Sequence, residues 1–130
     1  MKVLVTGGAG YIGSHIVEKL VKNESNIFIL DNLSTGFQNL INKKAKFIKG
    51  DIRNIKHVQK ACKNIDTVIH LAAVNGTKYF YEKPDVVLEV AAKGVINIID
   101  SCLKNRIKNL FLASSSEVYH FPKKIPTDEK

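Results

Sequence analysis

The sequence predicts an α/β domain in which helices cover both faces of an open parallel sheet, and three observations lead to this prediction. Five short apolar runs alternate with segments whose apolar residues recur at helical spacing. The runs are almost continuously apolar, which is typical of strands buried on both faces. Each run gives way to glycine, a carboxylate or small polar residues, and the carboxyl ends of parallel strands share one rim, where ligands bind.

The first three strands are predicted at residues 2–7, 26–31 and 46–51, which read KVLVTG, NIFILD and KFIKGD. Between the first two, residues 11–22 carry one apolar face and follow directly on glycines, so a helix is predicted there. That face consists of Ile12, Ile16, Val17, Leu20 and Val21.

The fourth and fifth strands are predicted at residues 66–73 and 108–116, which read DTVIHLAA and KNLFLASSS. A helical stretch at residues 55–65 precedes the fourth strand. A long helix at about residues 84–104 joins the two, because Pro84 suits the first turn of a helix and apolar residues recur behind it. Its predicted buried side consists of Val87, Ala91, Gly94, Val95, Ile98 and Cys102.

Composition narrows the class of protein. The 130 residues suffice for one domain, and no internal repeat or linker divides them. The net charge of +8 comes from scattered lysines without interleaved aromatics, which indicates a solvated surface and no nucleic-acid partner. No signal peptide or membrane-length apolar run is present, so no membrane partner is predicted. Cys62 and Cys102 occupy apolar helical positions and predict buried, reduced thiols of a cytoplasmic protein; no metal site is predicted.

The stretch TGGAGYIG, residues 6–13, lies between the first strand and the first helix. There Gly7 permits a tight turn, Gly10 lets the backbone approach a pyrophosphate, and Gly13 lets the helix pack closely on the sheet. The amides and dipole of the helix start then favour phosphate. Asp31 ends the second strand, where a carboxylate can bind ribose hydroxyls and repel a 2′-phosphate. The predicted cofactor is therefore NAD, in preference to NADP.

The stretches TGGAGYIGSH, DNLSTG, GDIRN, HLAA and SSSEVY, in this order, resemble the extended short-chain dehydrogenase/reductases. The resemblance covers the whole chain, and the most similar branch is the NAD-dependent epimerase/dehydratase group that acts on nucleotide sugars. It implies a Rossmann-type, doubly wound sheet of order 3-2-1-4-5. It also implies that residues 1–130 form the NAD-binding domain, ending before the family's Tyr-x-x-x-Lys helix and its substrate-binding part.

The resemblance further assigns a role to each rim of the sheet. The first helix start presents backbone to the pyrophosphate, the second strand end holds the adenosine ribose, and the third flanks adenine, whose exocyclic amine donates to Asp51. The fourth strand end lines the path to nicotinamide. The residues are Tyr11 and Ile12 for the pyrophosphate, Asp31 and Asn32 for the ribose, Asp51 and Ile52 for adenine, and Leu71, Ala72 and Ala73 for the path.

On the substrate side, the resemblance implies that Ser115 binds the reacting hydroxyl and that Glu117 matches one acid of the family's dehydratases. Ser116 replaces the other acid, which favours epimerase, reductase or oxidase action over dehydration. A capping or solvated role for Glu117 stays open.

Two Tyr-x-x-x-Lys spacings occur, but neither is predicted to be the family's catalytic pair. One, residues 119–123, contains a proline, and the other, residues 79–83, lies in a predicted loop. In the family, the tyrosine abstracts the hydroxyl proton with help from the lysine charge.

Three hypotheses follow for the function. The first is the NAD-binding portion of an enzyme that oxidises a hydroxyl of a nucleotide-linked sugar, with a nucleotide-sugar substrate and a homodimer allowed for the full-length form. The second is a non-catalytic dinucleotide-sensing module, and the third is a nucleic-acid-associated protein, which the dispersed lysines disfavour.

Overall fold

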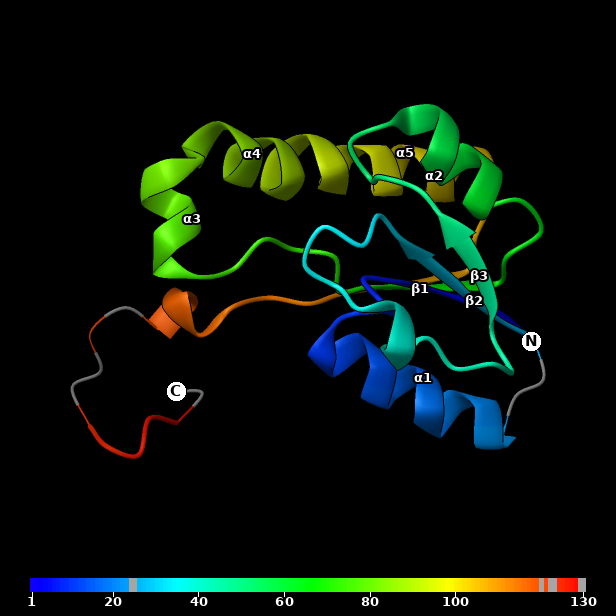
Figure 1. Cartoon of the computed structure of the whole chain (residues 1–130), viewed down its shortest axis with the longest axis horizontal. Coiled ribbons are helices and arrows are strands. Elements are labelled where there is room, and N and C mark those ends of the chain that lie inside the picture. Colours follow the sequence, from blue (N-terminus) through cyan, green and yellow to red (C-terminus); the bar gives the residue numbers. More distant parts are fainter. Residues whose placement is uncertain (24–25, 120, 122–123, 129–130) are drawn as a thin grey trace.

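Five parallel strands form one sheet of order β3-β2-β1-β4-β5 in the computed structural model of the chain, which confirms the predicted topology (Figure 1). The structure describes residues 1–23, 26–119, 121 and 124–128, apart from the side chains of Ser116 and Glu117. The strands are β1 (Lys2–Thr6), β2 (Asn26–Asp31), β3 (Lys46–Lys49), β4 (Thr67–His70) and β5 (Asn109–Leu112).

Helices cover both faces of this sheet. Helix α1 (Tyr11–Asn23) lies on one face, whereas α2 (Ile55–Ala61) and α5 (Val95–Lys104) lie on the other (Figure 1). Because side chains alternate along a strand, β1 contributes to both layers: Val3 and Val5 pack with the α1 side and Leu4 with the α2 and α5 side. This two-sided burial explains why the strands read as continuous apolar runs.

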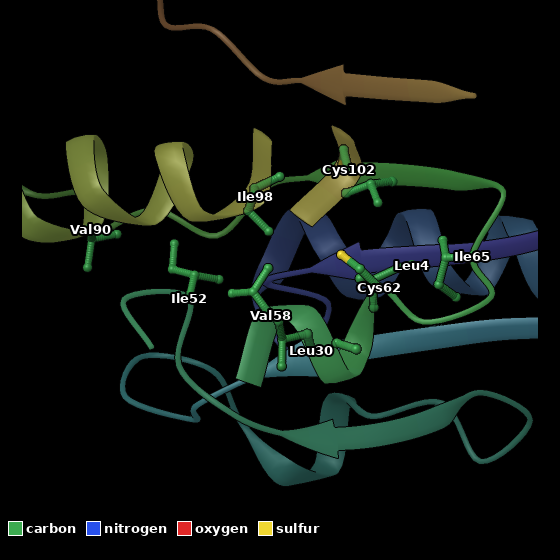
Figure 2. Packing of buried hydrophobic residues seen from close by; sticks show 11 residues of the cluster. Leu4, Leu30, Ile52, Val58, Cys62, Ile65, Val90, Ile98 and Cys102 are labelled. Atoms are coloured by element: carbon green, nitrogen blue, oxygen red, sulfur yellow. The ribbon is translucent and has the colours of Figure 1, made fainter. Parts of the chain in front are cut away.

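The larger apolar cluster lies between the sheet, α2 and the long helix (Figure 2). Its members include Leu4, Leu30, Ile52, Val58, Cys62, Ile65, Val68, Val90, Ile98 and Cys102. The thiols of Cys62 and Cys102 are in hydrogen-bonding contact, and this contact together with burial raises the pKa of the Cys62 thiol. Both cysteines are free and buried, as predicted.

The long helix predicted at residues 84–104 is present but is not uniformly α-helical. Helix α4 (Pro84–Leu88) leads through a π-helical segment, η2 (Glu89–Gly94), into α5. The wider π turn shifts the buried side by one position, so that Val90 is buried, and Ala91, predicted to be buried, is exposed. Gly94 allows this helix to lie close to the sheet edge, since a Cβ there would come within 2.5 Å of Ile52 Cδ1.

The prediction of a loop around residues 79–83 was wrong in part, because α3 (Thr77–Glu82) forms there. Two short 3₁₀ turns, η1 (Gln38–Leu40) and η3 (Ser116–Tyr119), complete the described elements. Within the described part of the chain, no helix has both the length and the apolar character needed to cross a bilayer.

Strand β5 differs from the other four strands. All four of its residues are exposed, and Phe111 and Leu112 expose 61% and 50% of their surface. It pairs with β4 on one side, and among the described residues no strand pairs with its other edge. The apolar composition that predicted a buried strand is therefore not matched by burial here.

Candidate cofactor-binding site

A pocket lies along the carboxyl ends of the first four strands, where the sequence predicted it. All predicted cofactor residues except Tyr11, Ile12 and Gly13 line it. The lining residues are Gly7, Gly10, Leu30, Asp31, Asn32, Ser34, Thr35, Gly36, Gly50, Asp51, Ile52, Leu71, Ala72, Ala73, Val74 and Val90.

The glycine turn forms the floor of this pocket. Gly7 has a φ of 72°, and a Cβ on it would lie 2.8 Å from the Ala72 backbone nitrogen, so both conformation and space require glycine. Its own amide donates to the carbonyl of Leu30 at 3.0 Å. At Gly10 a Cβ would meet only the Gly7 carbonyl oxygen, at 3.2 Å, whereas at Gly13 it would lie 2.1 Å from that oxygen. Gly10 therefore leaves the pocket open, and Gly13 lets α1 pack against the turn.

Helix α1 begins at Tyr11, immediately after the turn. The amides of Tyr11 and Ile12 belong to its first turn, where helix geometry supplies no carbonyl acceptor, and the helix dipole adds partial positive charge. Their side chains are 79% and 65% exposed and line a separate hollow on the outer side of α1. Any contribution of these two residues to the pocket is therefore through the backbone.

Asp31 joins the glycine turn to the end of β2. Its carboxylate accepts from the Ala9 amide at 3.0 Å and from the Leu33 amide at 2.8 Å, and only 8% of the residue is exposed. A carboxylate has about four acceptor positions, so these two bonds leave capacity for hydroxyl donors in the pocket.

Asp51, at the end of β3, lies in a dense polar network. Arg53 donates from Nη2 to Oδ2 at 2.8 Å and from its backbone amide to Oδ1 at 2.8 Å, and Asn32 Nδ2 donates to Oδ2 at 3.0 Å. Hydrogen bonds from Arg53 lower the pKa of Asp51 to about 2, despite partial burial. Arg53 also bridges to Glu89 of the π segment, with Nη1 3.0 Å from Oε2.

The backbone next to Asp51 is fixed from the long helix. Asn97 is buried on α5, and its Nδ2 donates to the Ile52 carbonyl at 2.8 Å. The Asp51 amide donates to His57 Nδ1 at 3.1 Å. These bonds hold the segment that would flank a base against the pocket wall.

The end of β4 is organised by a buried pair. Thr6 Oγ1 lies 2.6 Å from His70 Nδ1 and accepts from the amides of Leu71 and Ala72 at 3.2 Å each. With its acceptor positions used in this way, the threonine hydroxyl donates its proton to Nδ1, so that the imidazole is neutral. Burial lowers the pKa of His70 to about 4, which agrees with a neutral ring.

Ser115, one of the two predicted substrate-side residues, is not brought into this pocket. Ser115 lies in the exposed segment between β5 and η3, and it is not among the described residues that line the pocket. The side chain of Glu117 lies outside the described part of the structure. The same holds for Lys123, so the spacing from Tyr119 to Lys123 is not described.

The other tyrosine–lysine spacing is helical, which corrects the prediction of a loop. The amide of Lys83 donates to the Tyr79 carbonyl at 2.9 Å at the end of α3. Neither residue lines the pocket, so this finding does not make the pair catalytic.

The sequence analysis missed part of the site. Arg53 and Glu89 had no assigned role, although Arg53 is one of only two arginines in a lysine-rich chain. The loop at residues 34–36 also lines the pocket, and a Cβ on Gly36 would lie 3.0 Å from the Ala9 carbonyl oxygen. No group of three or more potential metal ligands occurs among the described residues.

Known proteins resemble the chain over almost its whole length. A putative UDP-glucose 4-epimerase of Methanocaldococcus jannaschii is 43% identical over 129 residues, which cover 98% of this chain and 42% of that protein. The crystal structure of the Thermus thermophilus UDP-glucose 4-epimerase in complex with NAD matches with a TM-score of 0.83 and 38% identity, covering 88% of this chain and 38% of that one. The Stenotrophomonas maltophila enzyme with bound NAD and formylated UDP-arabinopyranose matches with a TM-score of 0.90 and 28% identity, covering 99% and 41%.

The chain thus spans about two-fifths of the length of these relatives. The sequence profile that describes the NAD dependent epimerase/dehydratase family matches residues 3–130. Fold, pocket position and sequence agree, and the chain belongs to the NAD dependent epimerase/dehydratase family.

Proposed function

We propose that residues 1–130 form the NAD-binding unit of a nucleotide-sugar epimerase. The observation that carries this proposal is the pocket itself, in which a glycine turn, a helix start and the Asp31 carboxylate lie next to one another. The turn and helix start suit a pyrophosphate, and the carboxylate suits ribose hydroxyls. The NAD complexes of related epimerases support the same assignment.

Isothermal titration of the chain with NAD tests this unit directly. Gly10→Val places a side chain into the open part of the pocket, so NAD affinity should fall by about tenfold or more while the protein stays folded. The unfolding temperature serves as the control. Absence of heat with millimolar NAD in the folded wild-type protein would contradict the proposal.

We further propose that the full-length form oxidises and re-reduces a sugar hydroxyl of a UDP-sugar, with hydride passing to and from NAD. The names of the relatives support this reaction, and Ser115 is the candidate for hydrogen bonding to the hydroxyl. In a protein that also carries the family's Tyr-x-x-x-Lys helix, Ser115→Ala should lower turnover far more than NAD affinity. A non-catalytic NAD-sensing module is the alternative, and a natural full-length protein that lacks that helix yet binds NAD would favour it.

We propose a second copy of the chain as a partner. The long helix exposes an apolar stripe on the side away from the sheet, and the π segment brings its members close to one line along the helix. The stripe consists of Leu88, Ala92, Ile96, Ile99 and Leu103, of which Leu88 and Leu103 are 68% and 72% exposed.

Charges beside the stripe favour pairing with itself. Glu89, Lys93, Asp100 and Lys104 alternate in sign along one flank. If two copies pack antiparallel about a twofold axis near residues 96 and 97, Lys93 faces Asp100 of the second copy and Glu89 faces Lys104 of the second copy. A twofold interface thus pairs opposite charges at all four positions.

Charge reversal tests this interface by sedimentation velocity. Lys93→Asp should weaken the dimer, and the double variant Lys93→Asp/Asp100→Lys should restore it, because the twofold axis pairs the two positions. A wild-type protein that stays monomeric, or a double variant no better than the single one, would exclude this arrangement.

A cytoplasmic location, for which the two free thiols provide support, stays a prediction.

A further inference from the structure

The carboxylate of Asp51 has every acceptor position filled. Oδ1 accepts from the Arg53 amide at 2.8 Å, and Oδ2 accepts from Arg53 Nη2 at 2.8 Å and from Asn32 Nδ2 at 3.0 Å. Arg53 Nε is shared between the two oxygens, at 3.1 Å from Oδ1 and 3.2 Å from Oδ2. A carboxylate offers about four such positions. An adenine amine that donates to Asp51 must therefore replace one of these donors.

Arg53 is the donor that stays. Its guanidinium binds both carboxylate oxygens in the strong bidentate geometry, and its Nη1 is bound to Glu89 Oε2 at 3.0 Å on the long helix. Moving it would break a charged contact at each end. Because all of these donors except Asn32 belong to Arg53, the orientation of Asp51 is set by Arg53.

Asn32 is the donor that can leave. It is neutral, and its bond to Asp51 is longer than the bond from Nη2. Its Oδ1 accepts from the Ser34 amide at 2.9 Å, so the side chain stays anchored when Nδ2 is released. Asn32 also follows Asp31 directly in the chain, and both residues line the pocket where the adenosine ribose is expected.

We infer that Asn32 occupies the adenine position of Asp51 in the free protein and passes its hydrogen bond to the ribose when NAD binds. Arg53, braced by Glu89, keeps the carboxylate fixed and ionised as an acceptor during this exchange. This inference rests on the proposed binding of NAD to the pocket. It makes Arg53 a positioning residue and Asp51 a selector for a purine that donates at its 6-position.

The exchange distinguishes purines by chemistry. Adenine presents an amine, which replaces the Asn32 donor and leaves all four positions of Asp51 filled. A 6-oxopurine presents a carbonyl oxygen, which displaces Asn32, leaves one position empty and places an acceptor against a carboxylate. Since hydrogen bonds to charged groups contribute appreciably, NAD should bind about ten- to a hundredfold tighter than its hypoxanthine analogue.

Titrations with NAD and nicotinamide hypoxanthine dinucleotide test the inference, because only the 6-substituent of the purine differs. Arg53→Gln should bring the ratio of the two dissociation constants towards one, and Arg53→Lys should give an intermediate ratio. Asn32→Ala should weaken both ligands through the lost ribose contact but raise the ratio by about three- to tenfold, since adenine then fills a position that is otherwise empty.

Lys56→Gln is the matched control, because it removes the same charge from an exposed residue near Arg53 that does not contact Asp51 through its side chain. Its ratio should equal that of the wild type. Ratios that stay unchanged in Arg53→Gln, or that do not rise in Asn32→Ala, would overturn the inference. If the wild-type protein binds NAD in that case, the proposed cofactor site holds although the exchange of Asn32 does not occur.

Discussion

The two ends of the sheet rim differ in how completely the described residues build them. At the ends of β2 and β3, Asp31 and Asp51 are held by hydrogen bonds from their neighbours, and both line the pocket. At the end of β5, Phe111 and Leu112 are exposed, and Ser115 does not line the pocket. The β2–β3 side is organised by hydrogen bonds within this chain, whereas the β5 side exposes apolar surface.

The two sides of the rim differ in the hydrogen bonds that hold their polar groups. On the β2–β3 side, long-range bonds from Ala9 to Asp31 and from Asn32 to Asp51 combine with bonds from near neighbours. Arg53 lies two positions from Asp51, and Leu33 lies two from Asp31. Short loops after strands can form such contacts as soon as the sheet forms. At the β5 end, the Ser115 carbonyl accepts from the Val118 amide at 3.3 Å, within an exposed segment that does not line the pocket.

Replacing Gly13 should have the largest effect, because its Cβ would disrupt the glycine turn below the pocket. Gly13→Ala would place a Cβ 2.1 Å from the Gly7 carbonyl oxygen, where backbone must move, so the free energy of unfolding should fall by about 3 kcal/mol or more. Urea unfolding followed by circular dichroism measures it. Gly10→Ala is the control, because its Cβ meets only one backbone atom, at 3.2 Å, and a similar loss in both variants would contradict this account.

A smaller effect concerns His70, which lies between the two sides. Its pKa is lowered to about 4 by burial, against about 6.5 in an unfolded chain, so between these values the unfolded state binds a proton that the folded state does not. Stability should therefore fall as the pH decreases from about 6.5 to about 4, by up to about 3 kcal/mol. Thermal unfolding across this range measures the slope.

The variant His70→Asn cannot protonate and should flatten that slope. His15→Asn is the matched control, because His15 is exposed on α1 and should leave the slope unchanged. An equal slope in all three proteins would assign the pH dependence to other groups.

Replacing Asp31 should have the smallest effect of these changes, on the affinity and selectivity for dinucleotides. Asp31→Asn keeps an acceptor for the Ala9 or Leu33 amide but removes the charge, so NAD affinity should fall by about tenfold and discrimination against NADP should decrease. Titrations with both dinucleotides measure the change. Glu18→Gln removes a charge from the exposed side of α1 and serves as the control; unchanged selectivity in Asp31→Asn would argue against the ribose role.

Much of the fold could be predicted from periodicity alone. The five strands, α1 and the long helix lie where apolar spacing placed them, because burial on both faces leaves a clear pattern. The π segment could not be predicted, since the apolar residues of this stretch recur at ordinary α-helical spacing and nothing in the pattern marks an extra residue in one turn. Helix α3 was missed because Tyr79, Phe80 and Tyr81 favour strands and Gly76 precedes them.

The site divides in the same way. Gly7, Gly10 and Asp31 were predicted because their chemistry follows from position at a strand end, and the structure brings them into one pocket. Arg53 and Glu89 were missed because they are 36 positions apart in the chain, and no local sequence pattern indicates an ion pair over that separation.

The paired thiols of Cys62 and Cys102 have a practical consequence. They are 0% and 6% exposed and join α2 to the long helix, so an alkylating reagent can reach them only after these helices separate. The rate of labelling at neutral pH therefore reports the opening equilibrium of this layer without an introduced probe. If NAD slows the labelling of these thiols, the ratio of the rates with and without NAD measures how much bound NAD stabilises the packing of the two helices.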